Sequence, residues 1–368
     1  MSNVIYDING QRYTVMENPV IKSVRGPGYN YNFNKLTGLF QRWGNRLEED
    51  PAFSPIGPEI WDCECTTICP GNNNQGAVSP CKFCYKANNL QGSNLCLADF
   101  KTMIDKIPRV LTQVAFGTDS RAESNPELFD MMQYCRTLGI IPNITVSDIS
   151  DTTIKKLCDV CGAVAVSRYE NKHTCYKIVQ ALHAGGITQS NIHCLLSVET
   201  FDWCIETAKD AASNIPGLNA LVFLSLKKKG RAKSGFHSVS YDQFRMLFLY
   251  CLQHKVPVGF DSCSAPRFLR LVNSEHSIND TLRQRYIECC EPCESGIFSF
   301  YTGINGCFFP CSFTEGETGW QDGLSLLKCQ DFYTDIWYHP RTIAWRKRLI
   351  SSGETDNCRK CLTFPEIN

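Results

Sequence analysis

The sequence predicts an α/β protein: a partial (β/α)6 TIM-like barrel with a small C-terminal Cys-rich α+β domain. Short apolar segments alternate with amphipathic segments of about 10–15 residues between Glu59 and Asp261, as in βαβ units that build a parallel sheet. The C-terminal part differs, because it is rich in Cys, Phe and Gly. We expect an N-terminal hairpin and extended segment (1–58), the barrel (59–288) and the C-terminal domain (289–368).

Turn residues and hydrophobic periodicity define the individual elements. Asn9-Gly10 between two β-rich runs predicts a tight hairpin, and the Gly-, Asn-, Pro- and Tyr-rich residues 23–58 predict an extended connection. The expected strands are EIWDCECT, TQVAFG, IIPNITVS, GAVAVSR, NIHCLLS, NALVFLSL and VPVGFD. The expected helices are LADFKTMIDKIPRVL, ELFDMMQYCRTLG, DTTIKKLCDVC, HTCYKIVQALHAGG, TFDWCIETAKDAAS and YDQFRMLFLYCLQHK.

Composition excludes several classes of function. Lys and Arg together number 37, as do Asp and Glu, so the formal net charge is zero and no extended nucleic-acid interface is expected. The sequence has no apolar run long enough for a membrane helix and no secretory signal at its N-terminus. With 22 cysteines and no export signal, we expect a reduced, cytoplasmic protein whose paired cysteines are ligands or redox groups.

One stretch, TTICPGNNNQGAVSPCKFCY, carries three cysteines directly after the first expected barrel strand. They are Cys69, Cys81 and Cys84, and Tyr85 follows the last one. A [4Fe–4S] cluster is normally held by four cysteines, so three thiolates leave one iron open to another ligand. Cys65 competes with Cys69 for the first position. The alternative is that these thiols bind nothing, or bind a structural zinc.

Cys81-Lys-Phe-Cys84-Tyr85 resembles the second half of the C-x3-C-x-Φ-C motif of the radical S-adenosylmethionine (SAM) enzymes. The first half departs from that motif, because eleven residues separate Cys69 from Cys81 where the family usually has three. The resemblance implies a cluster held by Cys69, Cys81 and Cys84 that binds SAM, with Tyr85 beside it.

The C-terminal cysteines resemble the auxiliary cluster domain of the same superfamily, called SPASM, or its shorter twitch form. The resemblance implies one auxiliary [4Fe–4S] cluster held by Cys293, Cys311, Cys358 and Cys361. Four nearby cysteines are alternative ligands: Cys289, Cys290, Cys307 and Cys329. Cys158-x2-Cys161 stands between a helix and a strand and is not expected to bind metal. The apolar patterns place the others in the core: Cys96, Cys135, Cys175, Cys194, Cys204 and Cys251.

Polar residues at the ends of the expected strands are candidates to hold SAM. Gly117-Thr118-Asp119 resembles the family's GGE-like turn, in which the carboxylate contacts the SAM amino group. Further candidates are Ser167, Arg168, Ser197, Glu199 and Arg231. Arg231, in KKKGRAK, is expected to clamp the SAM carboxylate, because a guanidinium binds a carboxylate with two nitrogens. The alternatives are a solvated basic loop and lysines that meet an anionic substrate.

Cys263 and Asp261 follow the last apolar strand and are expected to face the barrel mouth as catalytic groups. There the Cys263 thiol can donate hydrogen to a substrate radical and the Asp261 carboxylate can accept a proton. The alternative is that both are turn and capping residues.

The resemblance implies that the enzyme reductively cleaves SAM and that the 5′-deoxyadenosyl radical abstracts a substrate hydrogen. It further implies oxidation, crosslinking or epimerisation of a peptide, with an external electron donor such as flavodoxin or ferredoxin. Two alternatives stay open: a nucleoside, nucleotide or other small-molecule substrate, and a non-catalytic iron–sulfur or zinc protein.

Overall fold

The protein is described here from a computed structural model that covers residues 2–74, 77–355 and 358–367. Its largest unit is a ten-stranded sheet. The strands of this sheet are β6 (Ile60–Glu64), β9 (Gln113–Gly117), β10 (Ile141–Val146), β11 (Ala163–Ser167), β12 (Gln189–Leu196), β13 (Ala220–Ser225), β14 (Val258–Phe260), β15 (Ser299–Thr302), β16 (Cys307–Phe309) and β17 (Leu324–Ser325). Their spatial order is β14-β13-β12-β11-β10-β9-β6-β15-β16-β17, so β14 and β17 are the two edges.

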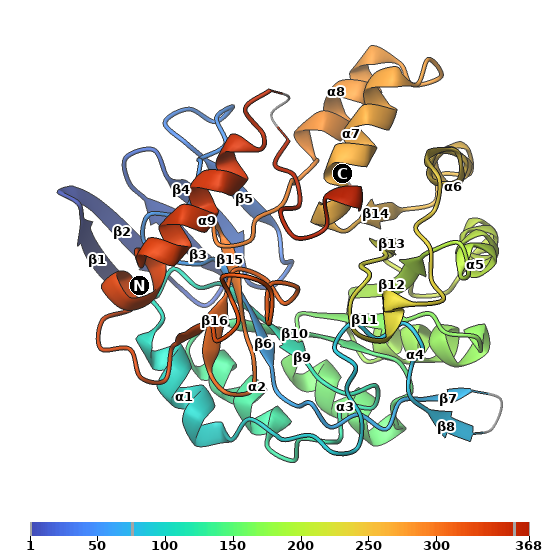
Figure 1. Ribbon diagram of the computed structural model, residues 1–368, viewed down its shortest axis with the longest axis horizontal. Coiled ribbons are helices and arrows are strands. Elements are labelled where there is room, and N and C mark those ends of the chain that lie inside the picture. The colour runs from blue at the N-terminus through green and yellow to red at the C-terminus, as the bar shows by residue number, and fades with distance from the viewer. Residues whose placement is uncertain (1, 75–76, 356–357, 368) are drawn as a thin grey trace.

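Strands β6 and β9 to β14 are parallel and are joined by helices. The helices are α1 (Leu97–Lys106), α2 (Leu128–Thr137), α3 (Asp151–Val160), α4 (Lys172–Ala184), α5 (Phe201–Ser213) and α6 (Tyr241–Gln253). They lie along the outside of the curved sheet (Figure 1). The predicted alternation of strand and helix is confirmed, and each of these seven strands falls on a segment that the sequence predicted to be a strand. Because these strands run in one direction, their C-terminal ends share one edge of the sheet, which is where the site is built.

The two faces of the parallel sheet differ in burial. Along β12, Ile192, Cys194 and Leu196 are buried, whereas His193 and Leu195 between them keep part of their exposure. Strand β13 alternates in the same way. Parallel strands covered on both faces normally read as continuous apolar runs, so this alternation means that one face is sealed by helices and the other is not. We call the second one the inner face.

The N-terminal residues form a second, antiparallel sheet. Its strands are β1 (Ser2–Ile8), β2 (Gln11–Glu17), β3 (Ile21–Arg25), β4 (Asn30–Asn34) and β5 (Phe40–Trp43). The predicted hairpin at Asn9-Gly10 is confirmed, with positive φ at both residues. The expected extended connection was wrong for residues 23–43, which carry the end of β3 and all of β4 and β5. In β4, Tyr31 and Phe33 are buried, whereas the asparagines that alternate with them are partly exposed. The Gly- and Asn-rich composition of the segment hid this alternation.

This sheet packs against the C-terminal part of the chain. Tyr31 and Phe33 share a hydrophobic core with Phe298 and other C-terminal residues. Arg42 of β5 donates to Glu59 Oε2 at 2.8 Å and to Glu294 Oε1 at 3.0 Å, and its guanidinium lies 3.6 Å from the centre of the Phe298 ring. The N-terminal sheet therefore holds the segment that begins at Cys293.

The C-terminal residues extend the large sheet instead of forming a sheet of their own. Strand β15 pairs in parallel with β6, and β16 and β17 continue in antiparallel fashion. Trp61 of β6 stacks on Phe100 of α1 at 5.2 Å and on Phe300 of β15 at 5.9 Å between ring centres, and each such pair contributes about 0.5–1.5 kcal/mol. The domain predicted at residues 289–368 thus shares its sheet and its core with the preceding residues.

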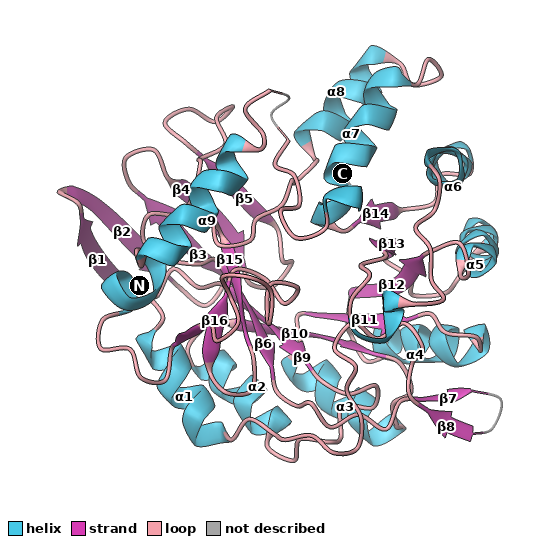
Figure 2. Cartoon of the chain, in the orientation of Figure 1, coloured by secondary structure: helices cyan, strands magenta, loops and turns pink. Residues whose placement is uncertain are grey.

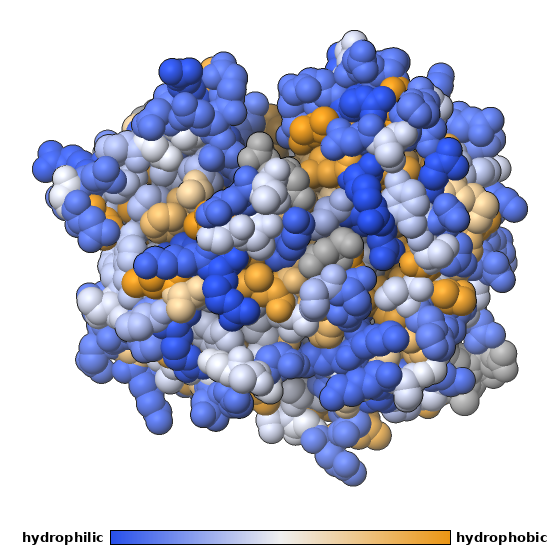
Figure 3. Space-filling model, turned by 45° about the horizontal axis from the view of Figure 1, so that its top comes forward, coloured by the Kyte–Doolittle hydropathy of each residue, from blue (hydrophilic) through white to orange (hydrophobic). Residues whose placement is uncertain are grey.

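Three further helices complete the fold: α7 (Ala265–Ser274), α8 (Asp280–Glu288) and α9 (Pro340–Ser351). Helices α7 and α8 form a pair that projects at the edge of the molecule near β14, and α9 crosses the N-terminal sheet (Figure 2). Figure 3 shows a face on which hydrophobic side chains occur in small patches among hydrophilic ones. No helix in the described part of the chain combines the length and hydrophobicity that a bilayer crossing needs.

Candidate active site

The loop after β6 brings three thiols together above the C-terminal edge of the parallel sheet. Cys84 and Cys69 both lie close enough to Cys81 to raise its pKa. Its Sγ accepts a hydrogen bond from Asn72 Nδ2 at 3.4 Å and lies 3.6 Å from Tyr169 Oη, in hydrogen-bond contact. Because Tyr169 follows β11, the loop reaches across several strand ends. The structure therefore groups the three cysteines that the sequence motif predicts.

The rival residue Cys65 points elsewhere. It is fully buried in the hydrophobic core, and its thiol donates to the carbonyl oxygen of Cys63 at 3.6 Å. Burial raises the pKa of the Cys65 thiol well above its usual value, which disfavours the thiolate that a metal needs. Cys69 keeps part of its exposure and is the residue of the two that lies beside Cys81. The loop thus places Cys69, and not Cys65, beside Cys81, and Cys69 remains the predicted first ligand.

The eleven residues between Cys69 and Cys81 fold out as a hairpin of β7 (Asn72–Asn74) and β8 (Ala77–Ser79). Residues 75–76 between these strands are not among those described. Gly71, at φ +94°, sits so close to the other end that an added Cβ would lie 1.9 Å from the Ser79 oxygen. The two ends of the insertion are therefore adjacent, and the hairpin adds length without separating the two cysteines.

The base of the hairpin is fixed to neighbouring strand ends. Ser147, directly after β10, donates to Asn72 Oδ1 at 2.5 Å, while the amide nitrogen of the same Asn72 faces Cys81. Ser120 donates to the Gly71 carbonyl oxygen at 2.5 Å. The position of Cys81 is thus tied to β9 and β10 through polar contacts that the sequence did not predict.

Arg231 holds the cysteine loop from the other side. Its Nε donates to the Cys81 carbonyl oxygen at 2.8 Å, its Nη1 donates to the Asn88 carbonyl oxygen at 3.0 Å, and its backbone N–H donates to the Cys84 carbonyl oxygen at 3.0 Å. The preceding Gly230 has φ +59°, and an added Cβ would lie 2.3 Å from the Tyr85 oxygen. Two of the guanidinium nitrogens of Arg231 thus already bind the loop backbone, and its contact with a SAM carboxylate stays a prediction.

Two lysines of the basic segment 227–233 also have partners inside the molecule. Lys227 forms an ion pair with Asp261, and Lys229 donates to the Phe313 carbonyl oxygen at 2.8 Å and to Glu317 Oε1 at 3.0 Å. This basic loop therefore connects the cysteine loop to the C-terminal residues. The lysines expected to meet an anionic substrate have internal partners at these two positions.

The environment of the triad fits a cluster held by thiolates. Burial raises the pKa of Cys81, and the Tyr169 hydroxyl and the Arg231 charge act in the opposite direction. Phe83 of the motif stacks on Tyr169 with 5.5 Å between ring centres, which shields the site. In the described residues no three His, Cys, Asp or Glu side chains converge as ligands of a single metal ion. A [4Fe–4S] cluster instead takes one cysteine per iron and needs no such convergence.

Tyr85, the aromatic after the motif, faces the C-terminal residues. Its ring lies 4.6 Å from that of Phe313, centre to centre. The Lys227 ammonium lies 5.3 Å from the centre of the same Phe313 ring. Tyr85 thus belongs to the contact between the cysteine loop and the segment that carries Cys311.

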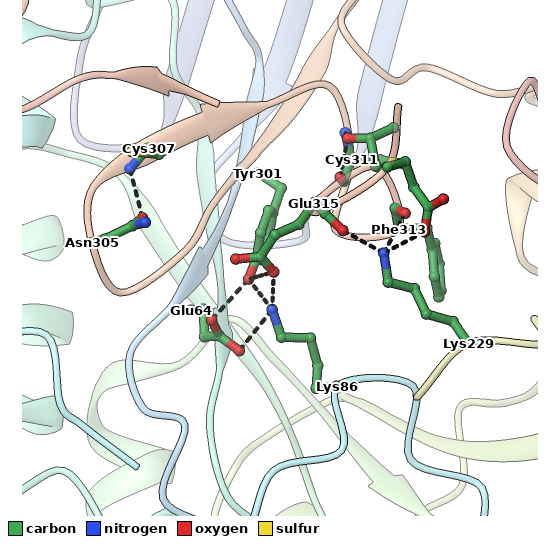
Figure 4. A network of polar contacts seen from close by, with 11 residues as sticks. Glu64, Lys86, Lys229, Tyr301, Asn305, Cys307, Cys311, Phe313 and Glu315 are labelled. Atoms are coloured by element: carbon green, nitrogen blue, oxygen red, sulfur yellow. Dashed lines mark hydrogen bonds and ion pairs between the residues drawn. The ribbon is translucent and has the colours of Figure 1, made fainter. Parts of the chain in front are cut away.

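A second network of polar contacts links the end of β6, the cysteine loop and the C-terminal residues (Figure 4). Lys86 donates to Tyr301 Oη at 2.7 Å, lies 3.1 Å from Glu64 Oε1 and forms an ion pair with Glu315. Tyr301 donates to Glu64 Oε2 at 2.9 Å. Burial raises the pKa of Glu64, with Lys86 opposing it. The network joins the end of β6, the cysteine loop and β15 in a nearly buried place.

The inner face carries polar groups that sequence reasoning missed. Asp62 of β6, Asn143 and Thr145 of β10 and His193 of β12 all alternate with buried residues and keep part of their exposure. Burial raises the pKa of Asp62 to about 7 and lowers that of His193 to about 4. The sequence did contain a signal of this polar face: WDCE and NIHC carry a polar residue at every second position. A parallel strand covered on both faces would be apolar throughout.

The turn predicted to bind SAM lies directly after β9, and its role in binding stays a prediction. Gly117 is exposed at the strand end, and Thr118 is partly exposed beside it. Asp119 is 2% exposed, and its carboxylate accepts backbone N–H groups of its own loop: Arg121 at 3.1 Å, Glu123 at 3.2 Å and Ser124 at 3.0 Å. Asp119 therefore organises the loop in this structure, instead of presenting a carboxylate to a cofactor.

The candidates on β11 and β12 separate into two groups. Ser167 is partly exposed at the end of β11 on the inner face. Arg168 turns to the helix layer, where it donates to Thr207 Oγ1 at 3.2 Å and to Glu206 Oε2 at 2.7 Å, so its predicted cofactor role is corrected. Ser197 is fully buried and accepts the N–H of Thr200 at 3.2 Å, which makes it a turn residue, again a correction. Glu199 pairs with His237 at 2.7 Å.

Asp261 and Cys263 lie at the end of β14, as predicted, but their surroundings differ from those of solvent-facing catalytic groups. Asp261 pairs with Lys227, and it accepts a hydrogen bond from Ser264 Oγ at 2.5 Å. The Cys361 thiol, near the C-terminus, raises the pKa of Cys263, and Cys263 in turn lowers that of Cys361. The last parallel strand thus ends close to the C-terminal cysteines.

Three of the predicted auxiliary ligands lie near one another. Cys293 lies close enough to Cys311 to raise its pKa, and it acts in the same direction on the pKa of Cys361. Cys358 is buried and is an electrostatic neighbour of Cys290. These contacts place Cys290 in the same region as Cys358 and Cys361.

The other cysteines occupy the positions that their sequence patterns suggest, with one exception. Cys161 is buried, and Cys158 lies partly exposed against the Leu182 carbonyl oxygen at 3.8 Å. Cys329 donates to the Leu326 carbonyl oxygen at 3.2 Å, away from the C-terminal cysteine group. The remaining core predictions fall on buried positions: Cys135, Cys175, Cys194, Cys204 and Cys251. Cys96 was wrong as a core residue, because it is exposed and caps α1 through the N–H of Asp99.

Comparison with known proteins gives structural likeness alone. No protein-family model and no curated protein matches the chain. The FeFe-hydrogenase maturase HydG from Carboxydothermus hydrogenoformans is 12% identical with a TM-score of 0.43, over 68% of this chain and 60% of that one. BtrN in complex with AdoMet and 2-DOIA is 11% identical with a TM-score of 0.43, over 83% and 93%.

A radical SAM methyltransferase from Sphaerobacter thermophilus is 12% identical with a TM-score of 0.41, over 71% of this chain and 75% of that one. The chain spans less than two thirds of the length of HydG. At these identities and TM-scores the matches assign no activity to this chain, so its function is inferred from its own residues.

Proposed function

We propose that this chain is a radical SAM enzyme that binds a [4Fe–4S] cluster through Cys69, Cys81 and Cys84 and cleaves SAM reductively. The resulting 5′-deoxyadenosyl radical would abstract a hydrogen atom from a substrate. The observation that carries the proposal is the grouping of these three thiols above the C-terminal edge of a parallel sheet. That edge is where ligands bind in sheets of this kind.

The chain's own residues would position the cofactors and exclude water. The bound cluster supplies one electron and an open iron for SAM. Arg231 fixes the backbone of the cysteine loop, and Asn72 and Tyr169 orient the sulfur of Cys81. Gly117 permits close approach of a ligand to the end of β9, and Ser167 offers a hydroxyl at the end of β11.

The proposed outcome is oxidation, crosslinking or epimerisation of a peptide, with flavodoxin or ferredoxin as the electron donor. The polar lining of the inner face favours a second candidate, a nucleoside or another small molecule rich in hydroxyls. Asp62, Thr145 and His193 can bind hydroxyl groups there, whereas the Asn143 amide is already hydrogen-bonded to Gln113 and to the N–H of Ala163. The raised pKa of Asp62 is suited to a group that accepts a proton near neutral pH.

The test compares wild type with Cys69→Ala and Cys65→Ala after anaerobic reconstitution and reduction with dithionite. We expect 5′-deoxyadenosine from wild type and from Cys65→Ala, and none from Cys69→Ala. Zinc in place of iron, or wild type that leaves SAM intact, would refute the proposal in favour of a non-catalytic metal protein. Equal loss of product in both variants would refute the assignment of Cys69.

A further inference from the structure

The inner face of the parallel sheet carries two polar side chains that have no partner in the protein. Asp62 lies in the middle of β6 and His193 lies in β12, and both stay partly exposed within a ten-stranded sheet. In the described part of the chain, neither side chain forms a hydrogen bond or an ion pair. Polar groups that are largely removed from water are normally hydrogen-bonded, so two groups without partners on one face point to a ligand.

Most inner-face residues on the strands β9 and β11, between β6 and β12, are small. Ala115 pairs with Asp62 on the neighbouring strand, and Ser167 pairs with His193. The other small residues on this face are Gly117, Ala163 and Ala165. The interior of a closed barrel is normally filled by bulky branched side chains. Small residues instead leave room for a ligand beside both polar groups.

A short C-terminal segment, residues 313–317, crosses the C-terminal edge of the sheet, and we call it the roof. On one side, the Phe313 ring lies 4.6 Å from the ring of Tyr85, centre to centre, in the cysteine loop after β6. On the other side, Lys229, which follows β13, donates to the Phe313 carbonyl oxygen at 2.8 Å and to Glu317 Oε1 at 3.0 Å. Strands β9 to β12 lie between β6 and β13, so five residues can reach both sides only because the sheet curves.

Charged contacts hold the roof on both sides. Glu315 forms an ion pair with Lys86 of the cysteine loop, and the Tyr301 hydroxyl lies 3.4 Å from Glu315 Oε2. Lys229 pairs with Glu317 at 3.0 Å. Figure 4 shows the two lysines reaching this segment from different loops. A peptide chain would have to break these contacts to reach the inner face, and breaking a largely buried ion pair is costly, whereas a small molecule needs a narrower path.

The ionisation of the two inner-face groups suits hydroxyl groups. Burial lowers the pKa of His193 to about 4, with Asp261 opposing it, so the imidazole is neutral near pH 7 and has one donor and one acceptor nitrogen. Burial and the charge of Glu294 raise the pKa of Asp62 to about 7, so its protonated form, which donates and accepts, is populated at neutral pH. A hydroxyl group also donates and accepts, whereas an ammonium group only donates.

We propose that the substrate is a small molecule with several hydroxyl groups that binds on the inner face beneath the roof, with Asp62 and His193 as its two polar contacts. This substrate class rests on the proposed function and chooses between its two candidates, because a peptide chain does not reach the inner face while the roof is in place. A polyol, a free sugar and the ribose of a nucleoside share the required chemistry, and the probes below distinguish them.

The test uses the reconstituted full chain with saturating SAM and no reductant, so that SAM fills its own site and is not cleaved. Saturation-transfer NMR is recorded with xylitol, D-ribose and adenosine, and with the peptide Gly-Ser-Thr-Ser-Gly, which carries hydroxyl groups on a longer chain. Asp62→Leu and His193→Phe remove the two contacts. Asn191→Ala, on the same face of β12 but already bonded to Asn219 at 2.9 Å, is the control. We expect transfer to at least one small probe in wild type and control, a loss of at least about fivefold in each variant, and no transfer to the peptide.

Neither side chain has a partner to lose, so the urea midpoints of Asp62→Leu and His193→Phe should match or exceed that of wild type. A marked loss of stability would show that the side chain has a structural role instead. No transfer to any small probe, transfer that survives either substitution, or transfer to the peptide would overturn the proposed site. SAM binding is read separately from the EPR spectrum of the reduced protein. If SAM does not bind, the enzyme proposal fails, while the inner-face site is still judged by the probes.

Discussion

Arg231 donates from its Nε to the carbonyl oxygen of Cys81 at 2.8 Å, across 150 residues of sequence. The contact joins the end of the sixth helix-linked strand, β13, to the loop that carries the three cysteines. The cysteine loop starts after β6, and this contact fixes it to the segment after β13 as well. The placement of Cys81 therefore depends on a residue that neither the motif nor its spacing includes.

Arg231→Lys should weaken the retention of iron by the cysteine loop. A lysine has one donor group on a flexible stem and cannot bond two carbonyl oxygens in the way that the guanidinium does. Loss of one or two such bonds should destabilise the loop by about 2 kcal/mol, or roughly 30-fold in its equilibrium. The measurement is the rate of iron release to a chelator. Arg245→Lys, which pairs with Glu275 elsewhere, is the control and should behave like wild type.

Gly230→Ala should disturb the same loop by a different route. Gly230 has φ +59°, and an added Cβ would collide with the backbone oxygens of Cys84 and Tyr85 at 2.5 and 2.3 Å. Gly235, at φ +76° with nothing within 4 Å of an added Cβ, provides a matched control. Gly235→Ala should cost only the backbone strain, about 1 kcal/mol, whereas Gly230→Ala should also lower iron content. Equal iron content in the two variants would show that the close approach has no role.

Lys86→Met should destabilise the fold strongly, because it leaves Glu64 buried without its cation. Removal of one partner from a buried ion pair costs about 3–5 kcal/mol. Urea unfolding should show this loss, and the double variant Lys86→Met/Glu64→Gln should recover part of it. Lys172→Met breaks more exposed ion pairs with Glu206 and Asp210 and should change stability by less than about 1 kcal/mol. A loss in Lys86→Met no larger than in this control would contradict the importance of the network.

Asp62→Asn should make stability less dependent on pH. Burial, with the charge of Glu294 adding to it, raises the pKa of Asp62 from 3.8 to about 7. The folded state therefore binds this proton more tightly than the unfolded state, so wild type loses stability as the pH rises through that window. The loss is up to about 1.4 kcal/mol per pH unit. Thermal unfolding at pH 6 and pH 8.5 should show a variant that gains on wild type at the higher pH, and no gain would contradict a raised pKa.

The parallel sheet and the grouping of the cysteine triad were within reach of the sequence. Strand and helix periodicity is a local property, and it predicted the elements between Glu59 and Asp261. The triad followed from C-x-Φ-C spacing directly after a strand. The choice between Cys65 and Cys69 needed the structure, because it depends on whether the chain at Cys65 still points into the core.

The contacts that hold the site could not be predicted in the same way. Lys86 and Glu315 are separated by 229 residues, and nothing in either local sequence indicates the other. Arg168 and Ser197 were assigned from their position at strand ends, but the direction of a side chain there depends on where the pleat ends. Cys263 was assigned to substrate chemistry from its position after the last strand. Its proximity to Cys361 could not be predicted, because it depends on how the C-terminal residues fold back onto β14.

The most direct test of the central claim is EPR of the reduced protein with and without SAM, using a variant in which Cys293 and Cys311 are Ala. We expect the signal of a reduced [4Fe–4S] cluster held by Cys69, Cys81 and Cys84, and a change in that signal when SAM binds the open iron. A cluster whose spectrum is unchanged by SAM, or a protein that assembles no cluster while Cys69, Cys81 and Cys84 are intact, would contradict it.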